Sequence, residues 1–170
     1  MPILKKALAV AIVAALLCTA DKLIAPIFAP AASFMWIAFI SWTVFFSSTN
    51  KERVQAIIGN IIGFFAACAI VYLGSLFQTI TPATPWIIAI CGIIATGLIN
   101  FGVMFFELAQ KYWLGSISGI FVGIAITFSG AGVGIPVYNL TLLAIIFVYG
   151  ILGHLSAWLT TKLSGMFIRG

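Results

Sequence analysis

Five polar side chains that could bind a solute or move a proton interrupt long apolar stretches of the sequence. They are Thr43, Asn60, Asn100, Ser118 and His154. Polar groups inside a membrane are costly and usually face protein or water. Counted along a helix from the nearest charged residue, each lies about 10–12 Å below one membrane face. Thr43 is counted from Lys51, and Ser118 from Lys111. The pattern predicts a polar layer to which five helices contribute.

Two interpretations of this layer are open. In one, the side chains form hydrogen bonds between helices, worth about 0.6 kcal/mol each on average. In the other, they line a constriction or a solute site inside the helix bundle. His154 titrates near neutral pH, so it could gate or relay a proton, or stay neutral with one hydrogen-bond partner. No nucleophile–base pair is recognisable, so we expect no catalytic residues and no enzymatic activity.

The elements that position these residues must lie in lipid. Of the 170 residues, 64% are hydrophobic and 6% are charged, whereas soluble domains carry about 25% charged residues. The apolar stretches are long and unbroken, unlike the alternating strands of a membrane barrel. Helices satisfy their own backbone groups in lipid. Residues 1–170 are therefore expected to form one all-α, polytopic transmembrane domain.

About six transmembrane helices account for nearly the whole chain. The predicted spans are Ile3–Ala25, Ala31–Ser47, Val54–Phe77, Trp86–Phe106, Tyr112–Phe128 and Val137–Thr160. Thr43 to Ser47 at the end of the second span is similar to Thr127 to Ser129 at the end of the fifth, and a long helix follows each. Two halves of three spans each would run in opposite directions, which is the inverted-repeat plan of many transporters and channels.

The basic residues indicate the orientation of the helices. If the N-terminus is cytoplasmic, seven basic residues lie inside: Lys5, Lys6, Lys51, Arg53, Lys111, Lys162 and Arg169. Lys22 alone lies outside, which fits the positive-inside rule with both termini cytoplasmic. We expect Asp21 and Lys22 to reach the outer interface by snorkelling. The first span also resembles a secretory signal peptide, but the charge pattern does not require cleavage. The net charge of +5 is spread over helix ends, so no nucleic-acid partner is expected.

Glycines at intervals of four residues predict close contacts between helices. The fifth span carries Gly115, Gly119 and Gly123, and the third carries Gly59 and Gly63. Such stripes let another helix approach closely, within or between subunits; a pore-lining role is the alternative.

A second group of glycines, Gly130, Gly132 and Gly134, lies in the predicted outer loop Ser129–Pro136. This loop is interpreted as a flexible turn or as a re-entrant turn that lines a cavity. Three cysteines at irregular spacing and a single histidine predict no metal site and no cofactor.

One stretch of the sequence resembles a known bacterial pattern. Gly115 to Gly123 is followed by Thr127-Phe128-Ser129-Gly130, similar to the small inner-membrane family called domain of unknown function 1097. Ser129 stands where that family has alanine. The chain is more distantly similar to the membrane domains of fusaric-acid resistance proteins and aromatic-acid exporters. The resemblance implies a bacterial inner-membrane location and supplies no functional residues.

These observations predict a channel or transporter for a small solute or ion, in the lipid bilayer of the bacterial inner membrane. Six short spans barely surround a pore, so we expect a homo-oligomer. The alternative is a membrane subunit that transports nothing and packs against a partner membrane protein through its glycine stripes.

Overall fold

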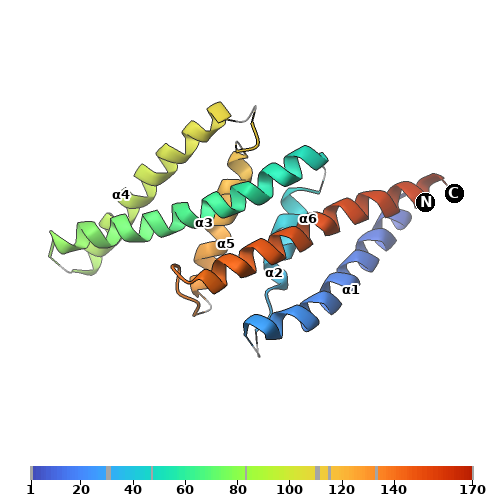
Figure 1. Cartoon of the computed structure of the whole chain (residues 1–170), viewed down its shortest axis with the longest axis horizontal. Helices are drawn as coiled ribbons and strands as arrows, with labels where there is room; N and C mark the ends of the chain where they lie inside the picture. Colours follow the sequence, from blue (N-terminus) through green and yellow to red (C-terminus); the bar gives the residue numbers. More distant parts are fainter. Residues whose placement is uncertain are drawn as a thin grey trace. The chain divides into compact units, whose positions relative to one another are not determined.

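In a computed structural model, the described residues form six α-helices and one short 3₁₀ helix (Figure 1). The structure describes residues 2–169 except 30, 31, 47, 83, 110, 111, 115 and 133. The helices are α1 (Pro2–Phe28), α2 (Met35–Val44), α3 (Asn50–Thr79), α4 (Pro85–Met104), η1 (Phe105–Ala109), α5 (Ile117–Gly132) and α6 (Leu140–Arg169). No strand occurs among the described residues, so the all-α prediction is confirmed for them.

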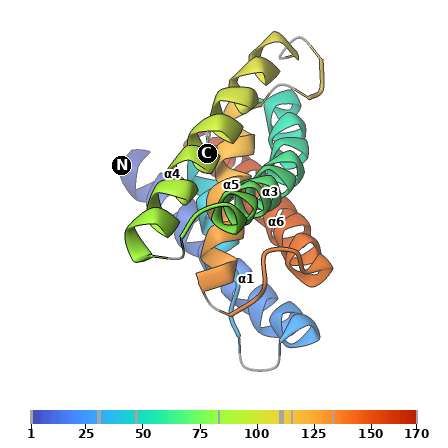
Figure 2. The ribbon, with the colours of Figure 1, turned by 90° about the vertical axis from the view of Figure 1, so that its left-hand side faces the viewer.

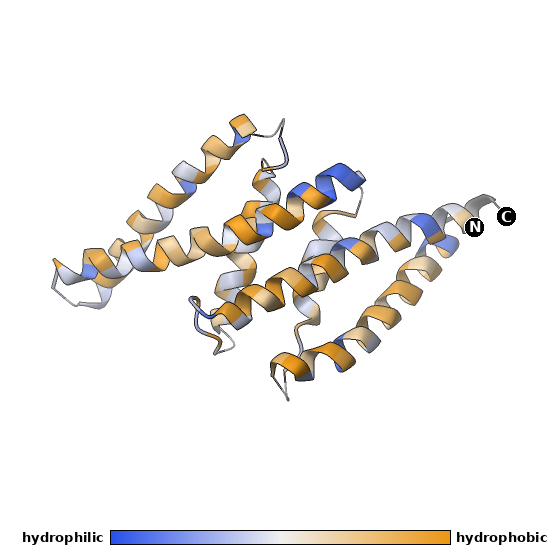
Figure 3. Ribbon diagram, viewed as in Figure 1, coloured by the Kyte–Doolittle hydropathy of each residue, from blue (hydrophilic) through white to orange (hydrophobic). Residues whose placement is uncertain are grey.

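Within the part of the chain that the structure describes, four helices are long and apolar enough to cross a membrane, namely α1, α3, the α4–η1 segment and α6. Figure 3 shows apolar colour along most of α1 and α4 and polar colour at the first turn of α3. The helices α2 and α5 are also apolar, but they have only 10 and 16 residues. The chain is a multi-pass membrane protein, and the predicted second and fifth spans stay predictions because α2 and α5 are short.

The helix α3 contains the whole predicted third span and begins four residues before it, because a capping motif starts the helix at Asn50. The Thr49 hydroxyl accepts a hydrogen bond from the Glu52 backbone N–H at 3.3 Å, and the Glu52 carboxylate accepts one from the Thr49 backbone N–H at 2.6 Å. This reciprocal pair is a capping box. The polar residues from Asn50 to Arg53, assigned to a loop, therefore form the first turn of α3.

The predicted start of the fifth span was wrong. The Ser116 hydroxyl accepts a hydrogen bond from the Gly119 backbone N–H at 3.1 Å, which is how an N-cap serine begins a helix. Residue 112 lies in a turn before the helix, and its carbonyl accepts a hydrogen bond from the Gln55 side chain at 2.6 Å. A depth for Ser118 counted along a helix from Lys111 therefore does not hold, and Lys111 itself lies outside the described residues.

Two further boundaries differ from the prediction. The helix α5 continues through Gly132, so Gly130 and Gly132 are helical and only Gly134 lies in the loop, where its φ is 90°. A side chain at Gly130 would overlap Leu142, so this glycine permits packing and does not break the helix. The helix α1 continues through Pro26, because a proline in the last turn removes only one backbone hydrogen bond.

The chain divides into two compact units. Unit 1 comprises residues 1–53 and 144–170, and unit 2 comprises residues 54–143. Unit 1 therefore contains α1, α2, the first turn of α3 and most of α6. Unit 2 contains the rest of α3 with α4, η1 and α5. The prediction of one transmembrane domain is not tested by this division.

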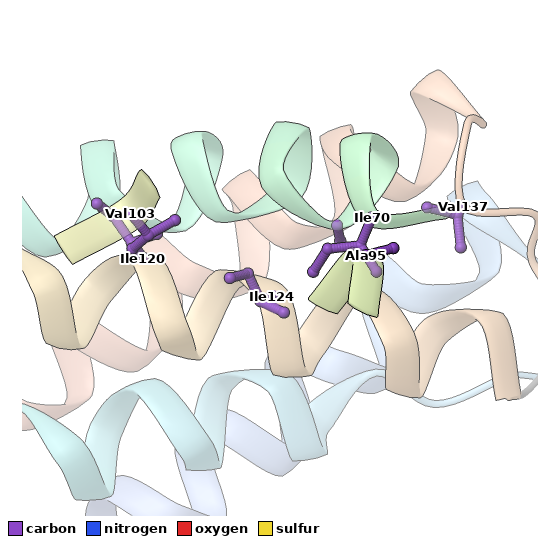
Figure 4. Packing of buried hydrophobic residues seen from close by; sticks show 7 residues of the cluster. Ile70, Ala95, Val103, Ile120, Ile124 and Val137 are labelled. Carbon is purple, nitrogen blue, oxygen red and sulfur yellow. The ribbon is translucent and has the colours of Figure 1, made fainter. Parts of the chain in front are cut away.

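Unit 2 is held together by apolar side chains from α3, α4 and α5. Its core cluster is Ala67, Ile70, Ala95, Val103, Ile120, Ile124 and Val137 (Figure 4). The helices α3 and α5 cross in both Figure 1 and Figure 2, and glycines line the crossing. A Cβ atom added at Gly63 would overlap the Ile120 carbonyl oxygen, and one at Gly123 would overlap Asn60 backbone atoms. The structure thus places Gly59, Gly63, Gly119 and Gly123 against backbone atoms of the crossing helix, whereas Gly115 lies outside the described residues.

Unit 1 has a similar crossing between α2 and α6. A Cβ atom at Gly153 would overlap the Ala38 carbonyl oxygen and approach the Ser41 Cβ at 2.7 Å. The helix α1 lies beside α6 and runs antiparallel to it, since Asp21 bonds Tyr149 while Val13 and Leu159 line one groove. The structure thus places α2 in contact with α6 and with α1.

Candidate functional site

Four buried polar residues of unit 1 have side-chain atoms that lack hydrogen-bond partners among the described residues. These residues, the buried polar cluster, are Ser41, Trp42, Arg53 and His154. Their exposed fractions are 0%, 3%, 8% and 3%. The unpartnered atoms are the Ser41 hydroxyl, the indole Nε1, the guanidinium Nε and both imidazole nitrogens.

Three helices position the buried polar cluster. Ser41 faces Gly153 on α6, where the absence of a Cβ lets the two backbones approach. The His154 ring packs on the ring of Phe45, the C-cap residue of α2, with centroids 4.8 Å apart. Arg53, in the first turn of α3, donates from Nη1 to the Asn50 side chain at 3.0 Å. Its positive charge interacts electrostatically with the His154 ring. Ser41 and His154 thus lie at the C-terminal half of α2, and His154 lies within electrostatic range of Arg53.

The buried polar cluster costs stability in a membrane unit. An unpartnered polar group costs about 1–3 kcal/mol when buried, and a charged one costs more. Native proteins leave few such groups, and each calls for an explanation such as a function or a bound molecule. Groups of this chemistry can hold water, a polar solute or an anion. His154 was predicted from the sequence, whereas Ser41, Trp42 and Arg53 were missed.

A second buried polar network of unit 1 surrounds Asp21, whose exposed fraction is 5%. Its carboxylate accepts hydrogen bonds from the Tyr149 hydroxyl at 2.7 Å, the Ser33 hydroxyl at 2.6 Å and the Phe34 backbone N–H at 3.1 Å. The snorkelling expected for Asp21 is therefore wrong, because three donors hold the carboxylate inside the protein. An open pocket of about 410 Å³ lies beside it, lined also by Lys22 and Cys18.

The Asp21 network and the buried polar cluster both complement the dipole of α2. Asp21 bonds the backbone N–H of Phe34, the N-cap residue, where the helix carries partial positive charge. His154 packs at the other end, beside the Phe45 cap, where a cation such as Arg53 is favoured. A short apolar helix thus has an acid at its N-terminal end and basic groups near its C-terminal end. This arrangement explains part of the burial of the charges but leaves the orphaned donors unexplained.

The predicted polar layer is only partly buried. Asn60 has an exposed fraction of 1%. With its side-chain amide assigned so that the nitrogen faces the neighbouring acceptors, it donates to the carbonyl oxygens of Gly119 at 2.8 Å and Ala56 at 3.3 Å. Asn100 is half-buried, and its side-chain oxygen has no partner in the described part of the chain. Thr43 is exposed and donates to the carbonyls of its own helix. Ser118 is exposed as well.

The five residues of this layer are divided between the units. Thr43 and His154 belong to unit 1 and the other three to unit 2, so a single layer of five helices stays a prediction. The depth calculated for Thr43 does not hold, because α2 ends at Val44 and no continuous helix joins Thr43 to Lys51. Asn60 acts as a bridge between α3 and α5, which supports the first of the two interpretations at that position.

The bridge at Asn60 gives a stability prediction. Asn60→Ala removes both hydrogen bonds and leaves a small void beside Gly119, so we expect a loss of about 1–2 kcal/mol in the free energy of unfolding. Thr43→Val is the control, because Thr43 is exposed and its hydroxyl bonds only α2. Unfolding in detergent with increasing dodecyl sulfate measures both. Equal stability of the two variants would show that Asn60 does not hold this crossing.

Within the described residues, no group of three or more His, Cys, Asp and Glu side chains could hold a metal ion.

The fold and the buried polar groups define a multi-pass helical membrane protein. The sequence profile of the protein family of unknown function DUF1097 matches residues 7–164, and the chain belongs to this family. No curated protein and no solved structure matches the chain. The more distant resemblance to fusaric-acid resistance proteins stays a prediction.

Proposed function

We propose that the protein is a channel or transporter for a small solute or ion. The observation that carries this proposal is the buried polar cluster, in which each of four polar side chains has at least one nitrogen or oxygen without a partner among the described residues. A passage for a hydrophilic solute needs hydrogen-bonding groups at membrane depth, and intramembrane ionisable residues commonly mark such a passage. Helix packing alone would favour apolar residues at these positions.

The internal organisation of each unit supports a transporter of the inverted-repeat class. Unit 1 combines α1, the short α2 and α6, and unit 2 combines α4, the short α5 and α3. Both α3 and α6 have 30 residues, and Gly63 and Gly153 each occupy the fourteenth position. Gly63 faces the carbonyl oxygen of Ile120 and also Gly123, three positions after Ile120. In the same way, Gly153 faces the carbonyl oxygen of Ala38 and also Ser41, three positions after Ala38. We infer a repeat of three helices plus three, in which the third helices are exchanged.

We propose a bacterial inner-membrane location with both termini cytoplasmic. In unit 1 the start of α1 and the end of α6 lie toward the same end (Figure 1), which supports termini on one side of the membrane. We also propose a homo-oligomer. Only 22% of the apolar window of α1 and 17% of that of α4 is buried, so both helices offer apolar surface to lipid or to other subunits.

The second candidate function is a membrane subunit that transports nothing. An apolar groove of about 290 Å³ between α1 and α6 supports it, with Val13, Leu17 and Trp158 in its lining. A side chain of a partner helix would fit such a groove. Copurification of a stoichiometric partner from detergent favours this function, and a homogeneous homo-oligomer without a partner counts against it.

Solute uptake by proteoliposomes tests the main proposal. Purified protein is reconstituted, and stopped-flow light scattering follows volume changes after osmotic shocks with glycerol, urea, formate or acetate. We expect uptake of at least one solute well above that of protein-free liposomes. Uptake equal to the protein-free value for every solute in the panel would favour the membrane-subunit function.

A further inference from the structure

We infer that Ser41, Arg53 and His154 form a binding site for a small monoanion that accepts hydrogen bonds. This inference rests on the proposed passage and names the class of its solute. Arg53 supplies a permanent positive charge, since a guanidinium is not deprotonated in proteins. Its exposed fraction is 8%, and it forms no ion pair with a carboxylate in the described ranges. A buried unpaired cation is costly unless an anion joins it.

The surrounding groups are mainly donors. The hydroxyl of Ser41 and the indole N–H of Trp42 can each donate one hydrogen bond, and a neutral His154 ring donates one. None of these donors has a partner among the residues described. A monoanion such as chloride, nitrate or formate offers acceptors only, so it matches this set better than a cation does. The deep burial of the side chains favours an ion of a few atoms.

The other charges near the site do not neutralise Arg53. The Glu52 carboxylate interacts electrostatically with Arg53. However, this carboxylate is exposed and accepts a hydrogen bond from the Thr49 backbone N–H at the helix cap. Asp21 is occupied by its three donors at the opposite end of α2. The partial negative charge at the C-terminus of α2 is opposed by the partial positive charge at the N-terminus of α3. One net positive charge remains, which fits a monoanion.

Binding is tested separately from transport. The unfolding temperature of the purified protein is measured against sodium chloride, nitrate and formate, with sodium gluconate added to constant ionic strength. A ligand that binds the folded state raises this temperature with concentration. We expect at least one anion to do so in the wild type. Arg53→Gln should raise the apparent Kd by about tenfold or more, because a charge-assisted hydrogen bond is lost.

Lys51→Gln is the matched control, because it removes one positive charge from the same helix turn at an exposed position. It should leave the apparent Kd unchanged. Ser41→Ala is the second variant if Arg53→Gln does not fold, and it should raise the apparent Kd several-fold. Uptake of the same anions by proteoliposomes of each variant follows in parallel.

The outcomes separate the site from the passage. If no anion raises the unfolding temperature, or if Arg53→Gln and Lys51→Gln change the Kd equally, the anion site is wrong. Glycerol or urea uptake in that case would leave the passage intact. Anion binding lost in Arg53→Gln, together with no uptake of any solute, would support the site and contradict the passage. If Arg53 serves only to cap α2, Arg53→Gln will lower the stability of the protein without changing anion binding. That result also overturns the inference.

Discussion

Replacing Gly153 with alanine should destabilise the protein by about 2–3 kcal/mol, although alanine normally strengthens a helix. The added Cβ would overlap the Ala38 carbonyl oxygen and crowd Ser41. A backbone oxygen cannot move aside as a flexible side chain can, so α2 and α6 must separate. Overpacking of this kind costs about 1–3 kcal/mol and occasionally more. Gly63→Ala should have an effect of similar size at the crossing of α3 and α5, where the obstacle is the Ile120 carbonyl oxygen.

Gly97→Ala is the control for both glycine substitutions. A Cβ atom at Gly97, on α4, would meet none of the described atoms within 4 Å. Only the gain in helix propensity remains there, so the free energy of unfolding should stay constant or rise by up to about 1 kcal/mol. Unfolding curves in mixed detergent give all three values. The free energy of unfolding should fall for both substitutions at the crossings and should not fall for Gly97→Ala. Equal changes in all three variants would show that the crossings are looser than the structure indicates.

Asp21→Ala should cost about 3–5 kcal/mol, the second large effect on stability. The substitution removes the acceptor of three donors that come from α6, from the segment before α2 and from the start of α2 itself. The Tyr149 hydroxyl and the Phe34 backbone N–H would remain buried without an acceptor, and each such group costs about 1–3 kcal/mol. Loss of one member of a buried charged network has effects of this total size.

Tyr149→Phe provides the comparison for Asp21→Ala. It removes one donor and leaves the carboxylate with Ser33 and Phe34, so a loss of about 1–2 kcal/mol is expected. The same detergent unfolding experiment measures both variants. An effect of Asp21→Ala no greater than that of Tyr149→Phe would contradict the network, and would return Asp21 to the exposed, snorkelling position expected from the sequence.

The apolar stretches predicted the helices well because lipid imposes length and composition on a span. The boundaries were less accurate where short polar motifs decide them. The capping box of Thr49 and Glu52 and the N-cap at Ser116 are visible in the sequence and could have corrected the third and fifth spans. A tendency to treat glycine as a loop residue placed Gly130 in a loop, whereas it lies in α5 opposite Leu142.

The candidate site was less predictable, because its partners are distant in sequence. Asp21 and Tyr149 are 128 residues apart, and no spacing rule joins them. A signal for Asp21 exists all the same, since α1 continues for a further seven residues to Phe28 and the acid therefore lies within an apolar helix. Arg53 was counted as an interfacial charge, which is where most basic residues at helix ends lie. Gly153 belongs to no glycine stripe, so the crossing beside Ser41 carried no sequence signal.

The central claim, that the buried polar cluster serves the passage of a solute, is tested most directly by His154→Leu. Leucine fills the space beside Phe45 and removes two nitrogens that lack partners among the described residues. The free energy of unfolding should therefore stay constant or rise. Uptake of the solute that the wild type conducts should fall about tenfold in proteoliposomes, whereas Thr43→Val should match the wild type. Wild-type uptake in His154→Leu, at equal protein content, would contradict a passage that uses this cluster.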